Sequence, residues 1–175
     1  MSNYRRFRVK GGTYFFTVNC LDRTSRHFLI DNIDNLRTAI QRVKNKRPFH
    51  IDGWVVLPEH MHCIWTLPDN DDDYATRWRL IKTFFSQSIT KNEYRSNNRI
   101  RRGERGIWQQ RYWEHTIRND NDYQRHMDYL HYNPVKHGYV KNVIDWPFSS
   151  FHRCVKKGMY PADWGEDVEG IEAGE

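Results

Sequence analysis

The sequence predicts an α+β fold, a ferredoxin-like sandwich: a four-stranded antiparallel sheet with helices on one face, plus an extra C-terminal helix that carries tyrosines. Segments rich in aromatic and β-branched residues, typical of strands, are interspersed with segments of helical apolar spacing. Their order is β, α, β, β, α, β, α, that of a ferredoxin-like unit followed by one further helix. With no internal repeat or linker, we expect one domain over residues 1–160 and an acidic tail over residues 161–175.

Four segments have the composition of strands. The first follows a Gly-Gly pair, and the second and third flank Pro58-Glu59, a tight turn, so they predict a β-hairpin. In this topology the third strand, which begins at His60, lies in the centre of the sheet. The predicted strands cover residues 13–21, 54–57, 60–67 and 112–117.

Three segments have apolar residues at helical spacing, and they cover residues 31–46, 74–94 and 119–133. The acid-rich run of residues 69–73 is expected to cap the second helix, because negative side chains favour a helix N-terminus. Asn119 is expected to cap the third helix, which Pro134 and Gly138 should end. Residues 95–106, polar and strongly basic, are expected to form a mobile loop.

The stretch of residues 54–68 places two histidines one residue apart in an apolar, strand-like run. Because side chains alternate across a strand, His60 and His62 would share one face while Met61 and Cys63 share the other. Two imidazoles on one strand face can bind a metal ion together. A hydrogen-bonded polar face is the more common role of such a pair, so the spacing alone leaves both interpretations open.

The net charge of +6 is unevenly distributed and indicates a polyanionic partner. All 28 Lys and Arg residues lie in residues 1–160, whereas residues 161–175 contain six acids and no Lys or Arg. Arginines interleaved with aromatic residues at positions 4–8 favour contact with phosphates and bases. Nucleic acid is the expected partner, and solubility alone is the alternative explanation. The acidic tail could fold over the basic surface as a DNA mimic or serve as a solubilising end.

The sequence contains neither a signal-peptide pattern nor an apolar run of the about 20 residues that a membrane span requires. Its three cysteines, Cys20, Cys63 and Cys154, are far apart and form no CxxC motif. They are expected to be reduced core thiols rather than zinc ligands or disulfides. We therefore expect a soluble cytosolic protein with no membrane contact.

Five motifs in matching order resemble the REP-associated tyrosine transposases, bacterial relatives of the single-tyrosine insertion-sequence transposases in the HUH nuclease superfamily. The resemblance covers about residues 4–164. The name HUH denotes two histidines flanking a bulky hydrophobic residue, here His60-Met61-His62. The motifs are YRRFRVKGGTYFFTVN (4–19), WVVLPEHMHCIWTLP (54–68), WRLIKTFFS (78–86), WQQRYWEHTIRNDNDYQRHMDYLHYNPVKHGYV (108–140) and DWPFSSFHR (145–153).

The resemblance implies the roles of the site residues. The nucleophile of the family precedes the Asn-Pro-Val-Lys-His-Gly signature and maps onto Tyr129, whereas helix spacing alone does not choose among Tyr123, Tyr129 and Tyr132. The third metal ligand maps onto Asn133, where related insertion-sequence enzymes usually have glutamine. Together with His60 and His62 it would hold Mg²⁺ or Mn²⁺. Glu59 is a candidate partner of the metal-binding histidines or a proton acceptor, and equally a turn residue.

The implied substrate is single-stranded DNA containing REP elements, short palindromes that fold as hairpins, in the bacterial cytoplasm and associated with the nucleoid. The implied reaction is cleavage and rejoining through a 5′-phosphotyrosine, by a monomer or a homodimer. Two alternatives remain open: a hairpin-binding regulator without catalysis, and a metal-dependent hydrolase without a covalent intermediate. From charge and aromatic interleaving, the expected DNA contacts are Arg5, Arg6, Phe7, Arg8, Arg99, Arg101, Arg102 and Arg105.

Overall fold

The computed structural model describes residues 7–22, 27–166 and 171, and the structural statements below concern these residues. Its sheet is antiparallel with the order β2-β3-β1-β4, which confirms the predicted ferredoxin-like topology. β3 lies between β1 and β2, so the histidine-bearing strand is central, as expected. The strands are β1 (Thr13–Asn19), β2 (His50–Val56), β3 (His60–Thr66) and β4 (Trp113–Thr116).

The hairpin of β2 and β3 closes through a hydrogen bond of 2.9 Å from the Leu57 N–H to the His60 carbonyl, around the predicted Pro58-Glu59 turn. β2 begins at His50, earlier than expected, and its register with β3 is irregular between Ile51 and Gly53. The lack of a side chain at Gly53 allows β2 to pack closely against α5 (Asp120–Lys136). A Cβ atom at this position would lie 2.7 Å from the Met127 sulfur, so the backbone of β2 approaches the helix behind it closely.

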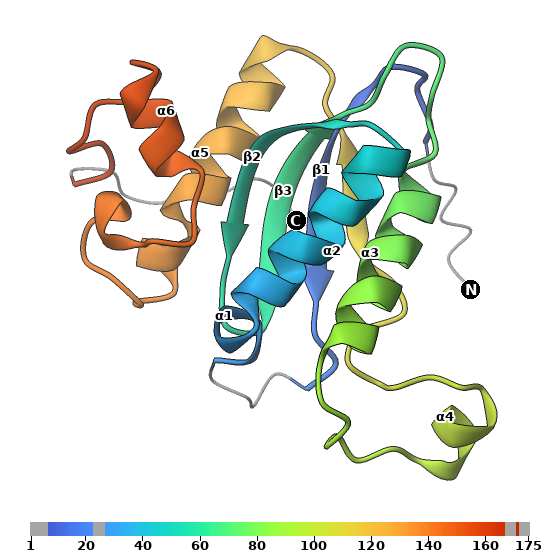
Figure 1. Ribbon diagram of the computed structural model, residues 1–175. Helices are drawn as coiled ribbons and strands as arrows, with labels where there is room; N and C mark the ends of the chain where they lie inside the picture. The colour runs from blue at the N-terminus through green and yellow to red at the C-terminus, as the bar shows by residue number, and fades with distance from the viewer. Residues whose placement is uncertain (1–6, 23–26, 167–170, 172–175) are drawn as a thin grey trace.

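One face of the sheet is covered by α2 (Ile33–Lys46) and α3 (Tyr74–Ser88), preceded by the short α1 (Phe28–Asp31) (Figure 1). The predicted first helix is thus interrupted at Asn32. The odd-numbered residues of β3 point into this layer, where Trp65 stacks on Trp78 with ring centroids 4.2 Å apart. This half of the core matches the predicted alternation.

The other face is covered by α5 (Asp120–Lys136), η1 (Val143–Asp145) and α6 (Phe151–Lys156) (Figure 1). A second apolar core joins Phe15 and Ile64 of the sheet to Met127 and Leu130 of α5. His60 and His62 point into this layer rather than into solvent, and both are buried. α5 therefore presents its side chains directly to the histidine-bearing strand.

Pro134 does not end α5, contrary to expectation: the helix continues to Lys136. Pro134 has no N–H to donate to the Leu130 carbonyl, but the helix continues past it, and the bond from the His137 N–H to the Asn133 carbonyl is present at 3.0 Å. Gly138, with φ of 73°, then ends the helix in the predicted manner. The extra turn adds Lys136 and orients His137.

α3 ends at Ser88 rather than Tyr94 because Arg105 takes up its last carbonyl groups. The guanidinium donates to the carbonyls of Ser86, Ile89 and Thr90 and forms an ion pair with Glu93. The segment expected to be a mobile loop is thereby attached to the body of the protein and contains a short helix, α4 (Asn97–Arg101).

At the other end of α3, the acid-rich loop caps the helix as predicted: the Asp73 carboxylate accepts from the Thr76 N–H at 3.0 Å. Asp71 forms a two-pronged ion pair with the buried Arg77. The three cysteines are buried, as expected for core thiols. Within the described ranges, no helix is both long and apolar enough to cross a membrane.

Candidate active site

The two histidines of β3 lie side by side at the start of that strand. Their ring centroids are 5.0 Å apart and the rings are nearly perpendicular. His62 is 1% exposed and His60 is 4% exposed. Because β3 alternates, both imidazoles point toward α5, and the pair forms one wall of a buried polar site.

Hydrogen bonds fix the orientation of both rings. The Nδ1 atom of His60 lies 3.0 Å from a carboxylate oxygen of Glu59, and His62 Nδ1 lies 2.8 Å from the hydroxyl of Thr17. The hydrogen bond from His60 lowers the pKa of Glu59 despite its burial, so the carboxylate is ionised and His60 Nδ1 carries the proton. With both Nδ1 atoms engaged, a metal ion would be held through the Nε2 atoms.

α5 supplies the opposite wall. The ring of Tyr129 is buried and lies 5.4 Å from the ring of His62. Asn133, one turn further along, is fully buried and interacts with His62. Tyr132, by contrast, packs against Trp164 on another side of the helix. The geometry therefore brings together His60, His62, Tyr129 and Asn133, the residues that the resemblance implied.

These residues fit a divalent metal ion. Burial, reinforced by nearby positive charge, lowers the pKa of His62 well below its usual value, so the imidazole is neutral as a ligand must be. Apart from its contact with His62, the buried amide of Asn133 has no hydrogen-bond partner in the described part of the chain. An unsatisfied buried amide is costly, and binding of its oxygen to a cation would remove that cost.

Two residues of this site were not anticipated from the sequence. Lys136 places its ammonium 4.7 Å from the ring centroid of Tyr129, and the ring of His137 lies 5.3 Å from that of His60. Both follow Pro134, where the helix was expected to end, so no direction could be assigned to their side chains. If the predicted helix had been extended past Pro134, helical spacing from Tyr129 would have placed both residues near this site.

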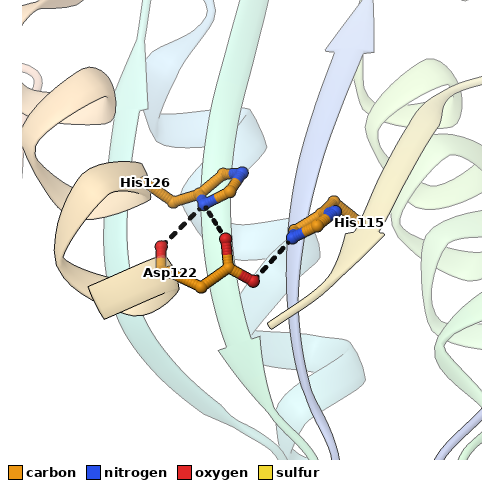
Figure 2. A group of neighbouring side chains, drawn as sticks. All are labelled: His115, Asp122 and His126. Carbon is orange, nitrogen blue, oxygen red and sulfur yellow. Dashed lines mark hydrogen bonds and ion pairs between the residues drawn. The ribbon is translucent and has the colours of Figure 1, made fainter. Parts of the chain in front are cut away.

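A second polar cluster lies beside the first. His115 of β4, together with Asp122 and His126 of α5, could hold a metal ion, because one donor atom from each lies within 4.8 Å of the others. Figure 2 shows Asp122 between the two imidazoles: His115 Nε2 is 2.8 Å from one carboxylate oxygen and His126 Nδ1 is 3.2 Å from the other. Sequence analysis did not identify this cluster, although Asp122 and His126 have helical i, i+4 spacing.

Hydrogen bonds already use one nitrogen of each histidine in this second cluster, His115 Nε2 and His126 Nδ1. His126 Nδ1 also lies 2.7 Å from the Asp122 carbonyl, which can only accept, so this nitrogen carries the proton (Figure 2). A metal ion would have to displace that proton and the one between His115 and Asp122. The ring of Phe15 separates the clusters, with centroids 5.5 Å from His62 and 4.9 Å from His126.

Comparison with known proteins identifies the family, although no family model matches the chain. The chain is 54% identical over 175 residues to the REP-associated tyrosine transposase of Escherichia coli K12, covering 100% of the chain and 98% of that relative. The chain belongs to the REP-associated tyrosine transposase family. A Haemophilus influenzae protein assigned to this family is 50% identical over 166 residues, covering 94% of each chain. The solved structure of a REP-associated tyrosine transposase bound to a REP hairpin matches with a TM-score of 0.83 at 54% identity, covering 100% of this chain and 98% of that one.

The DNA contacts expected for this transposase-family chain lie at two places. Arg5 and Arg6 are outside the described residues, and Phe7 and Arg8 lie near the start of β1, where Phe7 is 69% exposed. His60 pairs with Asn19 at the opposite end of β1. The other expected contacts are on the segment that contains α4. Arg101 and Arg102 are exposed and Arg99 is half-buried, whereas Arg105 is largely enclosed by its bonds to the end of α3.

Proposed function

We propose that this protein cleaves and rejoins single-stranded DNA at REP hairpins through a covalent bond to Tyr129. The observation that carries the proposal is the position of Tyr129, whose ring lies 5.4 Å from His62 within a buried site that also contains His60 and Asn133. A tyrosine beside a candidate metal site matches the requirement for an activated nucleophile, since a phenol with a pKa of about 10 attacks poorly by itself.

His60, His62 and Asn133 are the residues that would hold Mg²⁺ or Mn²⁺, and the two imidazoles make Mn²⁺ as suitable as Mg²⁺. When bound, such an ion polarises the scissile phosphodiester and offsets its developing charge. Glu59 keeps the proton of His60 on Nδ1 and thereby reserves Nε2 for coordination. The cluster of His115, Asp122 and His126 is the second candidate for a metal ion.

In the proposed reaction, the Tyr129 hydroxyl oxygen attacks the phosphorus in line with the leaving 3′ oxygen. The bond from phosphorus to the tyrosine oxygen forms as the bond to the 3′ oxygen breaks. The phenolic proton passes to solvent water, and the 3′ oxygen takes up a proton from water to become a free hydroxyl. The ammonium of Lys136, 4.7 Å from the Tyr129 ring centroid, favours negative charge at this point. The phosphotyrosine keeps the energy of the phosphodiester, so a 3′ hydroxyl can reverse the step.

The substrate follows from the relatives. A family member that is 54% identical over almost its whole length is bound to a REP hairpin in its solved structure, and we propose the same class of ligand here. The body of this chain has the basic charge that a DNA partner requires. Histidines and tyrosine come from one chain, so we propose that a monomer suffices, acting on chromosomal DNA in the bacterial nucleoid.

The decisive experiment incubates the protein with a labelled single-stranded REP hairpin and Mg²⁺ or Mn²⁺, followed by denaturing electrophoresis. We expect a DNA band linked to protein, which disappears in Tyr129→Phe and persists in the matched control Tyr132→Phe. Cleavage that survives Tyr129→Phe would instead indicate a hydrolase that activates water. Binding without any cleavage would indicate a hairpin-binding regulator.

A further inference from the structure

A basic groove lies between α3 and the segment from residue 91 to residue 112, which includes α4. Figure 1 shows this segment extending away from the sheet below α3. The groove has a volume of about 1220 Å³, more than the roughly 300–1,000 Å³ of small-molecule pockets, so its size suits an extended ligand. Glu104 is the acidic residue of its lining, and the cations besides Arg105 are Arg79, Lys82, Lys91, Arg95, Arg99 and Arg102.

Hydrogen bonds and an ion pair hold the outer wall of the groove against the end of α3. Arg105 donates to Glu93 at 2.6 Å and to the Thr90 carbonyl at 2.8 Å, which ties the segment to the end of α3. The hydrogen bond from Arg105 lowers the pKa of Glu93 to about 2, so the pair stays ionised at neutral pH. The charge of Arg105 is thereby balanced within the wall, and the other lining cations give the groove its positive charge, which attracts an anion.

The groove adjoins the end of the sheet that carries the candidate active site. The carbonyl of Ile107, which lines the groove, accepts a hydrogen bond of 2.8 Å from the N–H of Leu21, just beyond β1. The preceding residue, Cys20, donates to the carbonyl of Glu59 at 2.8 Å. Glu59 in turn holds the ring of His60. Two consecutive residues of the chain thus connect the floor of the groove with the histidine pair.

Aromatic side chains accompany the cations. Trp108 and Tyr112 line the groove and are only partly buried, and the ammonium of Lys82 lies 5.2 Å from the ring centroid of Tyr112. Tyr94, adjacent to the lining residue Arg95, is 89% exposed. Aromatic faces next to cations stack on bases, and only unpaired bases offer their faces, so the chemistry favours a single strand over a duplex.

We propose that this groove binds the unpaired DNA that continues from the scissile phosphate, separately from recognition of the hairpin stem. The proposal rests on the function proposed for Tyr129 and specifies where the strand leaves that site. The cations contact its phosphates, and the rings of Tyr94 and Trp108 stack on its bases.

The test compares binding of three synthetic probes: a blunt DNA hairpin, the same hairpin with oligothymidine extensions, and oligothymidine alone. The groove variant combines Arg79→Ala, Lys91→Ala and Arg95→Ala, three lining cations whose side chains are exposed or partly exposed. The matched control combines Arg37→Ala, Lys46→Ala and Lys157→Ala, three exposed cations outside the groove lining. Each variant is checked for wild-type thermal stability.

We expect extensions to tighten binding by the wild-type protein and the control by about tenfold or more, and the groove variant to lose this gain while binding the blunt hairpin as before. For oligothymidine, loss of three phosphate contacts should reduce the salt slope by about 2. The proposal would be overturned if the extensions still tightened binding by the groove variant, or if that variant lost as much affinity for the blunt hairpin. Binding of polyglutamate as tight as that of oligothymidine would also overturn it. The covalent assay with Tyr129→Phe is scored separately, so failure of cleavage and failure of strand binding are distinguishable.

Discussion

Glu59 holds His60 in its orientation through the 3.0 Å hydrogen bond to Nδ1. We predict that Glu59→Gln weakens Mn²⁺ binding by about tenfold or more, because an amide orients the ring less strongly and does not increase its basicity. Titration calorimetry with Mn²⁺ measures this effect. Tyr139→Phe is the control: it removes the long 3.4 Å bond to the other carboxylate oxygen and should change the affinity less. Equal affinities for Glu59→Gln and the wild type would show that Glu59 is a turn residue only.

His131 makes the stability of the fold depend on pH. It is fully buried on α5 with Nε2 2.9 Å from the Ser150 hydroxyl, and burial, with the charge of Arg153, lowers its pKa to about 3. As the pH falls from about 6.5 toward 3, the unfolded chain binds a proton at this residue that the folded chain does not, so the folded state loses stability. Between about pH 7 and about pH 5 the loss due to His131 is about 2 kcal/mol.

His131→Asn removes this titration, although it should also lower stability at neutral pH by opening space in the core. We therefore expect the free energy of unfolding to depend less on pH in the variant than in the wild type over this range. Urea denaturation at both pH values gives the two slopes. If the free energy of unfolding changed equally with pH in both proteins, His131 would already be protonated in the folded protein at about pH 5.

Among single residues, the sequence predicted side-chain direction correctly where a local rule, such as alternation along a strand, determines it. Alternation along the strand placed His60 and His62 on one face, and the structure confirms it. Choosing Tyr129 required the family resemblance, because helix spacing treats its neighbouring tyrosines alike. The contacts of Lys136 and His137 could not be predicted, because they depend on a helical turn that continues past a proline.

At the scale of elements, Arg77 connects α3 to the loop that precedes β2. It is 1% exposed and donates to the Asp71 carboxylate, to the carbonyl of Pro48 and to other backbone carbonyls. Lysine keeps the charge but lacks the planar fork, so we predict that Arg77→Lys lowers the free energy of unfolding by about 2–3 kcal/mol. Urea denaturation measures it, and the exposed Arg79→Lys should change stability by less than about 0.5 kcal/mol. If Arg77→Lys changed stability as little as Arg79→Lys, a lysine at position 77 would be able to replace the hydrogen bonds of the guanidinium.

The elements themselves were largely predictable, and their limits were not. The start of β2 at His50 was missed because Asp52 and Gly53 are poor strand formers, and pairing with β3 outweighs that local preference. The end of α3 was missed because a residue 17 positions beyond Ser88, Arg105, takes its last carbonyls. Local patterns contain no information about such distant partners.

At the scale of the whole molecule, the second core extends beyond the predicted domain limit at residue 160. Trp164 packs on Tyr160 and Phe151 with ring centroids 4.9 and 6.0 Å away, and the Tyr160 hydroxyl donates to Asp128 at 2.6 Å. We therefore propose that the domain extends at least to Glu166, with Ile171 packing at the edge of its second core. A chain ending at Met159 loses two aromatic side chains from the core and should be destabilised by about 3–5 kcal/mol.

A chain ending at Glu166 keeps both aromatic residues and loses Ile171, which packs at the edge of the second core, so thermal denaturation should show a smaller loss of stability than in the chain ending at Met159. It removes Asp167, Glu169, Glu172 and Glu175, so it also separates the two explanations of the acidic tail. Faster DNA cleavage by this chain would support a DNA mimic, and an equal rate would support a solubilising end. A loss of stability as large as that of the chain ending at Met159 would contradict the proposed domain limit.

The pairing of Tyr129 and His62 within one chain has a consequence for dosage in the cell. A site assembled from two copies would lose activity with the square of the concentration when the protein is scarce. Here the Tyr129 and His62 rings of one chain have centroids 5.4 Å apart, so with Tyr129 as the proposed nucleophile we expect activity to fall only in proportion to copy number. A few molecules per chromosome would retain the same turnover per molecule.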